Sequence, residues 1–277
     1  MGMKYINLLS LFIVLITVVA CGGGDKSLDE NFEPDKPVET LYNEASAEMD
    51  AKNYQRAFTL FNEVERQHPY SQWATRAQLM AAYAAYEGQS YNESILALDR
   101  YIRLHPGHKD IDYAYYLKAL NFYHQISDVG RDQEMTQLAR ESFQSLLRVY
   151  PNSKYARDAR LKLDLVLDHL AGKEMSIGRY YLVRNQYSAA IKRFLNVVRN
   201  YQTTTHTPEA LHRLVEAYLS LGIREEAVRV ASVLGYNYPG SAWYEDTYKL
   251  LDESEREKLM NDRGFIDRTF ESLFRPE

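Results

Sequence analysis

The sequence contains a single cysteine, Cys21, among 277 residues. One cysteine excludes an intramolecular disulfide framework and any zinc or iron–sulfur site built from several thiolates. Only 13 glycines and 8 prolines occur, which argues against a collagen-like, disordered or loop-dominated chain. Basic residues are in the minority, with 33 Lys and Arg against 38 Asp and Glu, so we expect no nucleic-acid partner.

Long apolar runs are also scarce, and charged residues make up 26% of the chain, too many for a polytopic membrane protein. The one long run extends from Ile6 to Ala20 and follows Lys4. It is shorter than the roughly 20 residues that span a bilayer as a helix. Residues 1–20 are therefore predicted to be a secretory signal peptide.

Cys21 lies where this apolar run meets the polar segment that begins with Gly22. Small residues before a cysteine at this place resemble a bacterial lipobox. We expect a thioether-linked diacylglycerol and an N-acyl chain on Cys21, which together would anchor the chain in a membrane. Residues 21–37 would then form a lipidated N-terminus and a flexible tether. The alternative is an ordinary signal peptide with an incidental cysteine.

A repeated pattern fills most of the remaining chain. Small residues such as Ala57, Ser94 and Ala190 are followed by large apolar residues four and seven positions later, which lie on one face of a helix. The large residues are Phe61, Leu98, Phe143 and Phe194, followed by Val64, Tyr101, Leu146 and Val197. The pattern resembles the tetratricopeptide repeat. It predicts an all-α superhelix of about five tetratricopeptide-like helical hairpins over residues 38–251.

A Pro-x-Ser sequence recurs at 69–71, 151–153 and 239–241. We expect each proline to end one helix and each serine to cap the next. A second small residue lies twelve positions before three of the repeat positions, at Ala45 and Ala82 for example, and indicates a close approach of two helices.

Two stretches break the period. Residues 127–133 are predicted to form a long loop between helices, and a helical pattern follows Ser153 before the fourth unit begins. We place an N-terminal half at about 38–151 and a C-terminal half at about 152–251. Residues 252–277 are expected to form a capping helix, because the last repeat of such a stack must be covered.

The first helix of each hairpin is expected to line the concave wall of the stack. Tyrosine offers a large contact area with few rotors and a polar tip, which suits a partner with aromatic or apolar side chains. Each tyrosine has the alternative role of packing between repeats. The predicted peptide-binding groove consists of Tyr42, Arg76, Tyr83, Tyr86, Tyr113, Tyr116 and Tyr123.

The sequence has no phosphate-binding glycine loop, no Gly-x-Ser-x-Gly elbow and no His-Glu-x-x-His motif. His105 and His108 have a spacing seen in metal sites, but they lie in a predicted turn with no obvious carboxylate or third ligand at helical spacing. We expect no catalytic residue, no metal and no cofactor apart from the acyl chains on Cys21. The chain is predicted not to be an enzyme.

Several local segments resemble the BamD family, also known as ComL, the tetratricopeptide lipoproteins of the outer-membrane β-barrel assembly machinery. These segments are 99–106, 111–113, 131–132 and 150–155. The resemblance implies a lipid-anchored scaffold on the periplasmic face of the outer membrane. It also implies that C-terminal repeats bind the POTRA domains of the barrel protein BamA, and that N-terminal repeats bind unfolded barrel precursors.

The resemblance further implies that other assembly lipoproteins join the complex, and it suggests Arg184 and Asn185 as partner-binding residues. An alternative from another class stays open. The chain could be a periplasmic repeat lipoprotein that acts as an adaptor for peptidoglycan or envelope enzymes. Binding of barrel C-terminal peptides distinguishes the two hypotheses.

Overall fold

The structure is a computed structural model that describes residues 35–261. The chain divides into two compact units, Met1–Pro37 and Val38–Glu277. The described part of the second unit consists of α-helices and their connections, and these residues include no strand. The predicted signal peptide and Cys21 lie outside the described residues.

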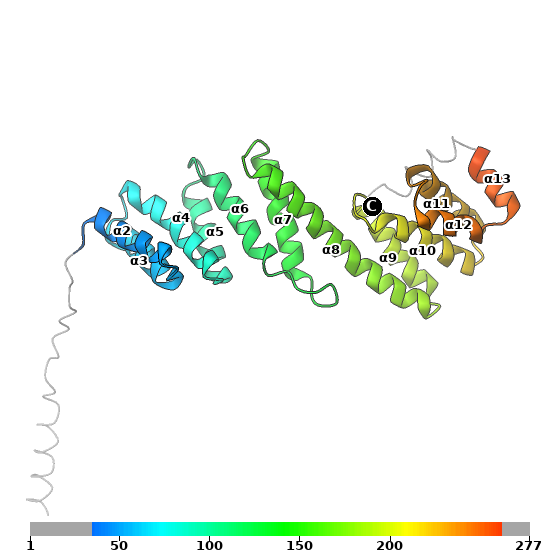
Figure 1. Cartoon of the computed structure of the whole chain (residues 1–277), viewed down its shortest axis with the longest axis horizontal. Helices are drawn as coiled ribbons and strands as arrows, with labels where there is room; N and C mark the ends of the chain where they lie inside the picture. The colour runs from blue at the N-terminus through cyan, green and yellow to red at the C-terminus, as the bar shows by residue number, and fades with distance from the viewer. Residues whose placement is uncertain (1–34, 262–277) are drawn as a thin grey trace, which may run out of the picture. The chain divides into compact units, whose positions relative to one another are not determined.

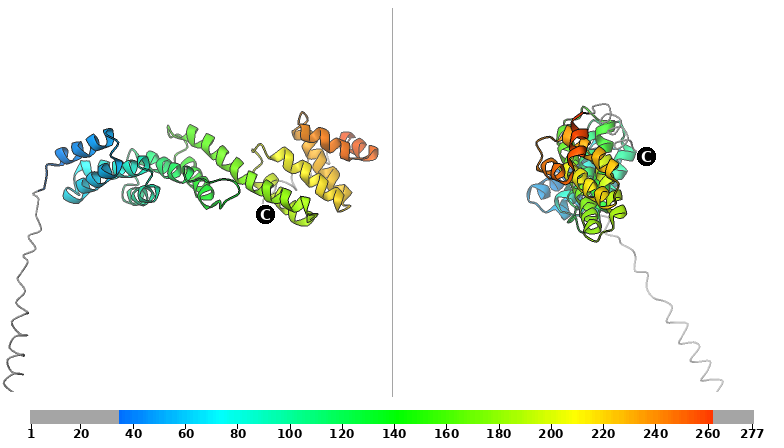
Figure 2. Two further views of the ribbon diagram at one scale, coloured as in Figure 1. Left: turned by 60° about the horizontal axis from the view of Figure 1, so that its bottom comes forward. Right: turned by 90° about the vertical axis from the view of Figure 1, so that its right-hand side faces the viewer.

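Ten of these helices pair into hairpins, and each helix packs against its neighbours in the chain (Figures 1 and 2). The hairpins are α2 (Val38–Asp50) with α3 (Tyr54–Gln67), α4 (Gln72–Glu87) with α5 (Tyr91–Leu104), α6 (Ile111–Tyr123) with α7 (Glu134–Val149), α8 (Ala156–Val183) with α9 (Tyr187–Asn200), and α10 (Thr207–Ser220) with α11 (Arg224–Asn237). Two short helices follow, α12 (Ala242–Leu250) and α13 (Glu253–Asn261). The predicted all-α class with five helical hairpins is confirmed.

Four of the five turns inside the hairpins share one backbone conformation. The φ angle is positive at Lys52 (61°), Gln89 (59°), Asn185 (59°) and Gly222 (75°). In the second hairpin, the N–H that follows Gln89 donates to the carbonyl five residues earlier at 2.9 Å, which completes a Schellman motif. This conformation costs a non-glycine residue about 1–2 kcal/mol, so three hairpins accept local strain to reverse the chain within three residues.

The repeated large residues form the core. Those at the fourth and seventh positions have no exposed surface in any of the four units in which the sequence analysis identified them. They pack in two clusters, one around α2, α3 and α4 and one that continues from α4 to Leu251. The small residues of the repeat allow the two helices of a hairpin to approach closely. At Gly178 of α8, for example, an added Cβ would lie 2.4 Å from the Phe194 ring of α9. The spacing therefore predicted the core correctly.

Two of the three serine caps are confirmed. Ser71 and Ser241 precede α4 and α12, and each hydroxyl oxygen accepts a backbone N–H of the first turn, at 3.1 and 3.2 Å. The prediction for Ser153 is wrong, because α8 begins only at Ala156. The Ser153 hydroxyl oxygen accepts the Tyr155 N–H within the turn at 3.1 Å, and the hydroxyl donates to Asp112 at 2.7 Å and so links the α7–α8 turn to α6.

The most irregular element is α8, with 28 residues. The antiparallel α7 has 16 residues and so lies along only the first part of α8, whereas Gly178 in the second part packs on α9. The predicted long loop is confirmed between α6 and α7, and the Lys173 ammonium of α8 holds it by donating to the Gly130 carbonyl at 3.0 Å.

The last described helix, α13, packs against α11. The Arg224 guanidinium at the start of α11 binds the Glu255 carboxylate at 2.7 Å and the Asp252 carboxylate at 3.1 Å, so ion pairs fasten the beginning of α13 to the fifth hairpin. The remainder of the expected capping helix, beyond Asn261, lies outside the described residues.

Candidate functional site

A row of partly exposed tyrosine rings lies on the second and third hairpins. We call Tyr83 and Tyr86 of α4, Tyr113 and Tyr116 of α6, and Tyr155 before α8 the aromatic wall. The ring centroids of Tyr83 and Tyr113 are 6.4 Å apart, so the row crosses from α4 to α6. Tyr155 continues it, at 5.3 Å from Tyr113 and 4.9 Å from Tyr116. The wall is thus one continuous aromatic surface.

Two further rings lie beside Tyr86 at the C-terminal end of α4. The Tyr86 and His124 rings are 5.7 Å apart, and the His124 ring stacks nearly parallel to Tyr91 at 6.4 Å. Tyr123, predicted for the groove, contacts His124 at 5.6 Å and packs edge-on against the buried Phe143 at 6.1 Å. Tyr123 therefore joins this end of the wall to the core.

The two remaining groove predictions, Tyr42 and Arg76, lie toward the first hairpin. The Tyr42 side chain is only 6% exposed and its ring is 5.3 Å from Phe61 and 4.8 Å from Trp73, so it belongs to the core. The exposed Arg76 guanidinium lies 5.5 Å above the Tyr42 ring. Arg76 offers surface to a ligand, and Tyr42 offers almost none.

The hydroxyl groups of Tyr83, Tyr113 and Tyr116 stay neutral. Burial raises the pKa of Tyr83 to about 12 and raises the pKa values of Tyr113 and Tyr116 still further. Tyr116 donates a hydrogen bond to Asp158, which also binds the Lys162 ammonium at 2.7 and 2.8 Å. Burial alone raises the pKa of Asp158, but these hydrogen bonds outweigh it and keep that pKa below its usual value.

Sequence reasoning omitted Tyr155 and Tyr91 from the groove. Tyr155 belongs to the Pro-x-Ser-x-aromatic turn, and Tyr91 belongs to the repeated Tyr-x-x-small motif. Each residue thus belonged to a recognisable motif. The motif of Tyr155 indicated a turn and that of Tyr91 indicated a repeat, and neither indicated that the ring contacts a neighbouring hairpin.

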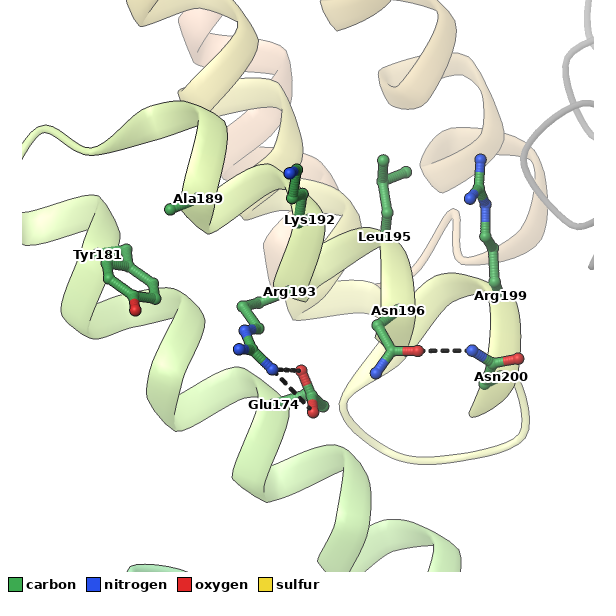
Figure 3. Close-up of a pocket in the computed structure, with 9 residues that line it drawn as sticks. All are labelled: Glu174, Tyr181, Ala189, Lys192, Arg193, Leu195, Asn196, Arg199 and Asn200. Carbon is green, nitrogen blue, oxygen red and sulfur yellow. Dashed lines mark hydrogen bonds and ion pairs between the residues drawn. The ribbon is translucent and has the colours of Figure 1, made fainter. Parts of the chain in front are cut away.

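A second candidate site is an open cleft of about 740 Å³ in the fourth hairpin, which we call the α8–α9 cleft (Figure 3). The Arg193 guanidinium of α9 reaches the Glu174 carboxylate of α8 at 3.2 Å. One turn further along α9, Asn200 donates a side-chain hydrogen bond to Asn196 at 2.5 Å. The other lining residues are Tyr181 of α8 and Ala189, Lys192, Leu195 and Arg199 of α9.

The length of α8 explains this cleft. Val166, Leu170 and Glu174 follow one another at four-residue spacing and so share one face of α8. Val166 and Leu170 are buried, whereas Glu174 lines the cleft, because α7 lies along only the first part of the helix. Since α7 does not reach it, the second part of α8 leaves this face open at the cleft.

Arg184 and Asn185, suggested from the family resemblance, lie in the turn next to this cleft and do not line it. The Arg184 guanidinium stacks 3.7 Å above the Tyr180 ring. Asn185 adopts the left-handed conformation that closes the hairpin, and its side-chain oxygen accepts the Tyr187 hydroxyl at 2.9 Å. Sequence reasoning missed Arg193, because no repeat position marks an outward-facing residue of α9.

The described residues contain no group of three or more His, Cys, Asp or Glu side chains that could hold a metal ion. His105 and His108 have other partners, since their ring nitrogens lie 2.7 Å from the Gln78 amide oxygen and 2.7 Å from the Tyr101 hydroxyl. Within the same part of the chain, no helix has both the length and the apolar character to cross a bilayer.

Comparisons with known proteins relate these features to a family. A family model described as outer membrane lipoprotein (YfiO) matches residues 34–234. A Caulobacter vibrioides protein named outer membrane protein assembly factor BamD is 50% identical over 242 residues, which cover 87% of this chain and 79% of that protein. The chain belongs to the BamD family. The predicted family is thereby confirmed.

Further BamD proteins extend the match. The Rickettsia prowazekii BamD is 48% identical over 249 residues, which cover 90% of this chain and 98% of that protein. The Neisseria meningitidis serogroup A BamD is 35% identical over 258 residues, with 88% and 96% covered. A solved tetratricopeptide domain of P58(IPK) aligns over 85% of this chain at 14% identity, with a TM-score of 0.40 that is too low to bear on function. Membership of this lipoprotein family associates the chain with the outer membrane.

Proposed function

We propose that this chain is a non-enzymatic scaffold that assembles β-barrel proteins into the outer membrane. It is held on the periplasmic face by acyl chains on Cys21. Its N-terminal repeats bind the C-terminal segments of unfolded barrel precursors, and its C-terminal repeats bind a BamA-like barrel protein through POTRA domains. Other assembly lipoproteins join the complex. The observation that carries the proposal is the aromatic wall, found in a chain whose relatives are named assembly factors.

The spacing of the wall supports binding of an extended strand. Strands of membrane barrels alternate apolar and polar side chains, so an unfolded precursor presents an apolar side chain at every second residue. Side chains on one face of a strand are about 6.6 Å apart. The Tyr83 ring lies 6.4 Å from Tyr86 and 6.4 Å from Tyr113, which matches this repeat. Neutral hydroxyls beside the rings can bind the backbone of the guest.

Peptide binding tests this part of the proposal. The full chain, purified from membranes in detergent, is titrated with a peptide of alternating apolar residues that ends in phenylalanine. Tyr83→Ala combined with Tyr116→Ala should weaken binding at least tenfold, because each aromatic contact contributes about 0.5–1.5 kcal/mol beyond its buried area. Tyr236→Ala is the matched control, since that ring is 63% exposed and lies on α11 outside the wall. Equal weakening by both variants, with unchanged helical content, contradicts the proposed groove.

The α8–α9 cleft is the proposed site for the POTRA domains. Lys192, Arg193 and Arg199 line it on α9, against one carboxylate from Glu174. Arginine presents several N–H donors in a planar fork and is suited to carboxylate and backbone acceptors of a partner. Arg184, over Tyr180 at the adjoining turn, extends the proposed surface together with Asn185.

Pull-down from solubilised membranes tests this second interface. Wild-type chain should recover a barrel protein with POTRA domains, and Arg193→Ala should recover much less of it. Arg103→Ala is the matched control, because Arg103 is an exposed arginine of α5 outside the cleft. Recovery of peptidoglycan enzymes without a barrel protein would instead support the adaptor alternative.

The lipid anchor has its own test. Several buried acyl chains contribute about 0.8 kcal/mol per methylene, so attachment through Cys21 should resist high salt. Cys21→Ala should move the chain to the soluble fraction after the cells are broken. Continued membrane attachment of that variant contradicts lipidation as the anchor.

A further inference from the structure

A cavity of about 530 Å³ opens where α4 and α6 begin. It is lined by Gln72, Thr75 and Arg76 of α4 and by His108, Lys109 and Asp110 of the segment before α6. Gln72 is the first residue of α4, and Asp110 directly precedes α6. The neighbouring cavity includes the same His108 and Lys109.

The charge of this cavity is positive. Arg76 and Lys109 each carry a positive charge, and neither forms an ion pair with a carboxylate of the described residues. Asp110 provides the one negative charge, and its carboxylate lies 3.8 Å from His108. The N-terminal ends of α4 and α6 add partial positive charge from their backbone dipoles. A bound anion would therefore meet two unpaired cations.

The cavity continues the aromatic wall. Arg76 and Tyr83 are seven residues apart on α4, so they share one face and lie about 10 Å apart along the helix axis. Asp110 precedes Tyr113 by less than one turn of α6, and the Tyr83 and Tyr113 rings contact each other at 6.4 Å. A guest that leaves the wall toward the helix N-termini enters this cavity after about three extended residues.

We propose that this cavity binds the C-terminal carboxylate of the peptide whose side chains lie on the aromatic wall. Arg76 and Lys109 pair with the carboxylate, and the peptide runs from the Tyr86 end of the wall toward the beginning of α4. This inference rests on the proposed binding of barrel precursors and adds to it an orientation and an end to the groove. The site thereby distinguishes the end of a chain from an internal apolar strand.

The test compares one peptide in two forms, with a free C-terminal carboxylate and with a C-terminal amide. Both are titrated against the full chain in detergent, at low and at high salt. The free acid should bind about tenfold more tightly, because hydrogen bonds to charged groups are roughly twice as strong as neutral ones. This advantage should shrink at high salt, since Arg76 and Lys109 lie at the surface.

Variants assign the advantage to the cavity. In the double variant Arg76→Gln with Lys109→Gln, the two peptide forms should bind equally, because neither cation remains to distinguish the acid from the amide. The control Arg103→Gln removes one exposed charge outside the cavity and should preserve the tenfold difference. A variant that lost its fold would lose both peptides and would be recognised by that loss.

The outcomes separate the two proposals. Equal affinity of acid and amide for the wild-type chain overturns the carboxylate site and leaves the peptide groove standing. A preference for the acid that persists in the double variant also overturns it, because another group must then bind the carboxylate. Failure of both peptides to bind the wild-type chain overturns the proposed groove and the carboxylate site together.

Discussion

The contact between Gly178 and Phe194 predicts an unusual response to a small substitution. Replacing glycine by alanine inside a helix normally stabilises it by about 1 kcal/mol. At Gly178, the added Cβ would lie 2.4, 2.8 and 2.8 Å from three atoms of the Phe194 ring, distances that real Cβ atoms do not adopt. Phe194 has no exposed surface, so the ring cannot turn out into solvent to relieve the clash.

The magnitude follows from these opposing effects. Overpacking of a core costs about 1–3 kcal/mol. A contact as short as 2.4 Å puts Gly178→Ala in the upper part of that range, about 2–3 kcal/mol, which exceeds the gain in helix propensity. We expect Gly178→Ala to destabilise the contact between α8 and α9 by about 1–2 kcal/mol. Because Arg193 directly precedes Phe194, displacement of the ring should also shift the α8–α9 cleft and weaken recovery of the proposed barrel partner.

Hydrogen exchange is the suitable assay, because long repeat arrays do not unfold in one cooperative step. Amides of α8 and α9 around the contact should exchange about 5- to 30-fold faster in the variant. Gly107→Ala is the control, since nothing lies within 4 Å of the position of its added Cβ. Combining Gly178→Ala with Phe194→Leu should recover part of the loss. Slower exchange in Gly178→Ala than in the wild type would refute the reasoning.

Two further predictions concern the turns and the wall. Because φ is positive at Gly222 and at Lys52, Gly222→Ala should lower the free energy of unfolding of the fifth hairpin by about 1 kcal/mol, whereas Lys52→Gly should raise that of the first. Local hydrogen exchange measures both changes, and a change in the same direction for the two variants contradicts the prediction. The lowered pKa of Asp158 means that its stabilising contribution exists above the usual carboxyl pKa and disappears as pH falls through the folded value. When the chain is titrated with acid and followed by circular dichroism, Asp158→Asn should therefore lose less stability than the wild type. The difference should be less than about 1 kcal/mol, because the Asp158 carboxylate is 47% exposed and screened by water.

The sequence predicted those parts of the fold that depend on neighbours within one hairpin. The offsets of four and seven residues identified buried side chains such as Phe61 and Leu98, because a repeat places the same residue type in the same environment. Ser153 departed from the pattern, since α8 begins only at Ala156 and the Ser153 hydroxyl donates to Asp112, about 40 residues earlier. Such a contact leaves no trace in local spacing.

The same distinction applies to the candidate sites. Tyr83, Tyr86, Tyr113 and Tyr116 lie on the first helices of the hairpins, so the repeat register alone indicated their common surface. Tyr42 was assigned to the groove on the same basis, although its ring packs on Trp73 of the next hairpin. The α8–α9 cleft depends on the unequal lengths of α7 and α8. No single sequence motif predicts how far one helix extends past its neighbour.

The continuity of α8 has a consequence for two guests bound at once. Asp158, beside Tyr116, and Glu174, beside Arg193, belong to the same unbroken helix and are 16 residues apart. An α-helix rises 1.5 Å per residue, so about 24 Å of rigid rod separates them. Under the proposed function, α8 therefore keeps a strand bound at the aromatic wall at a fixed distance from a partner bound in the α8–α9 cleft.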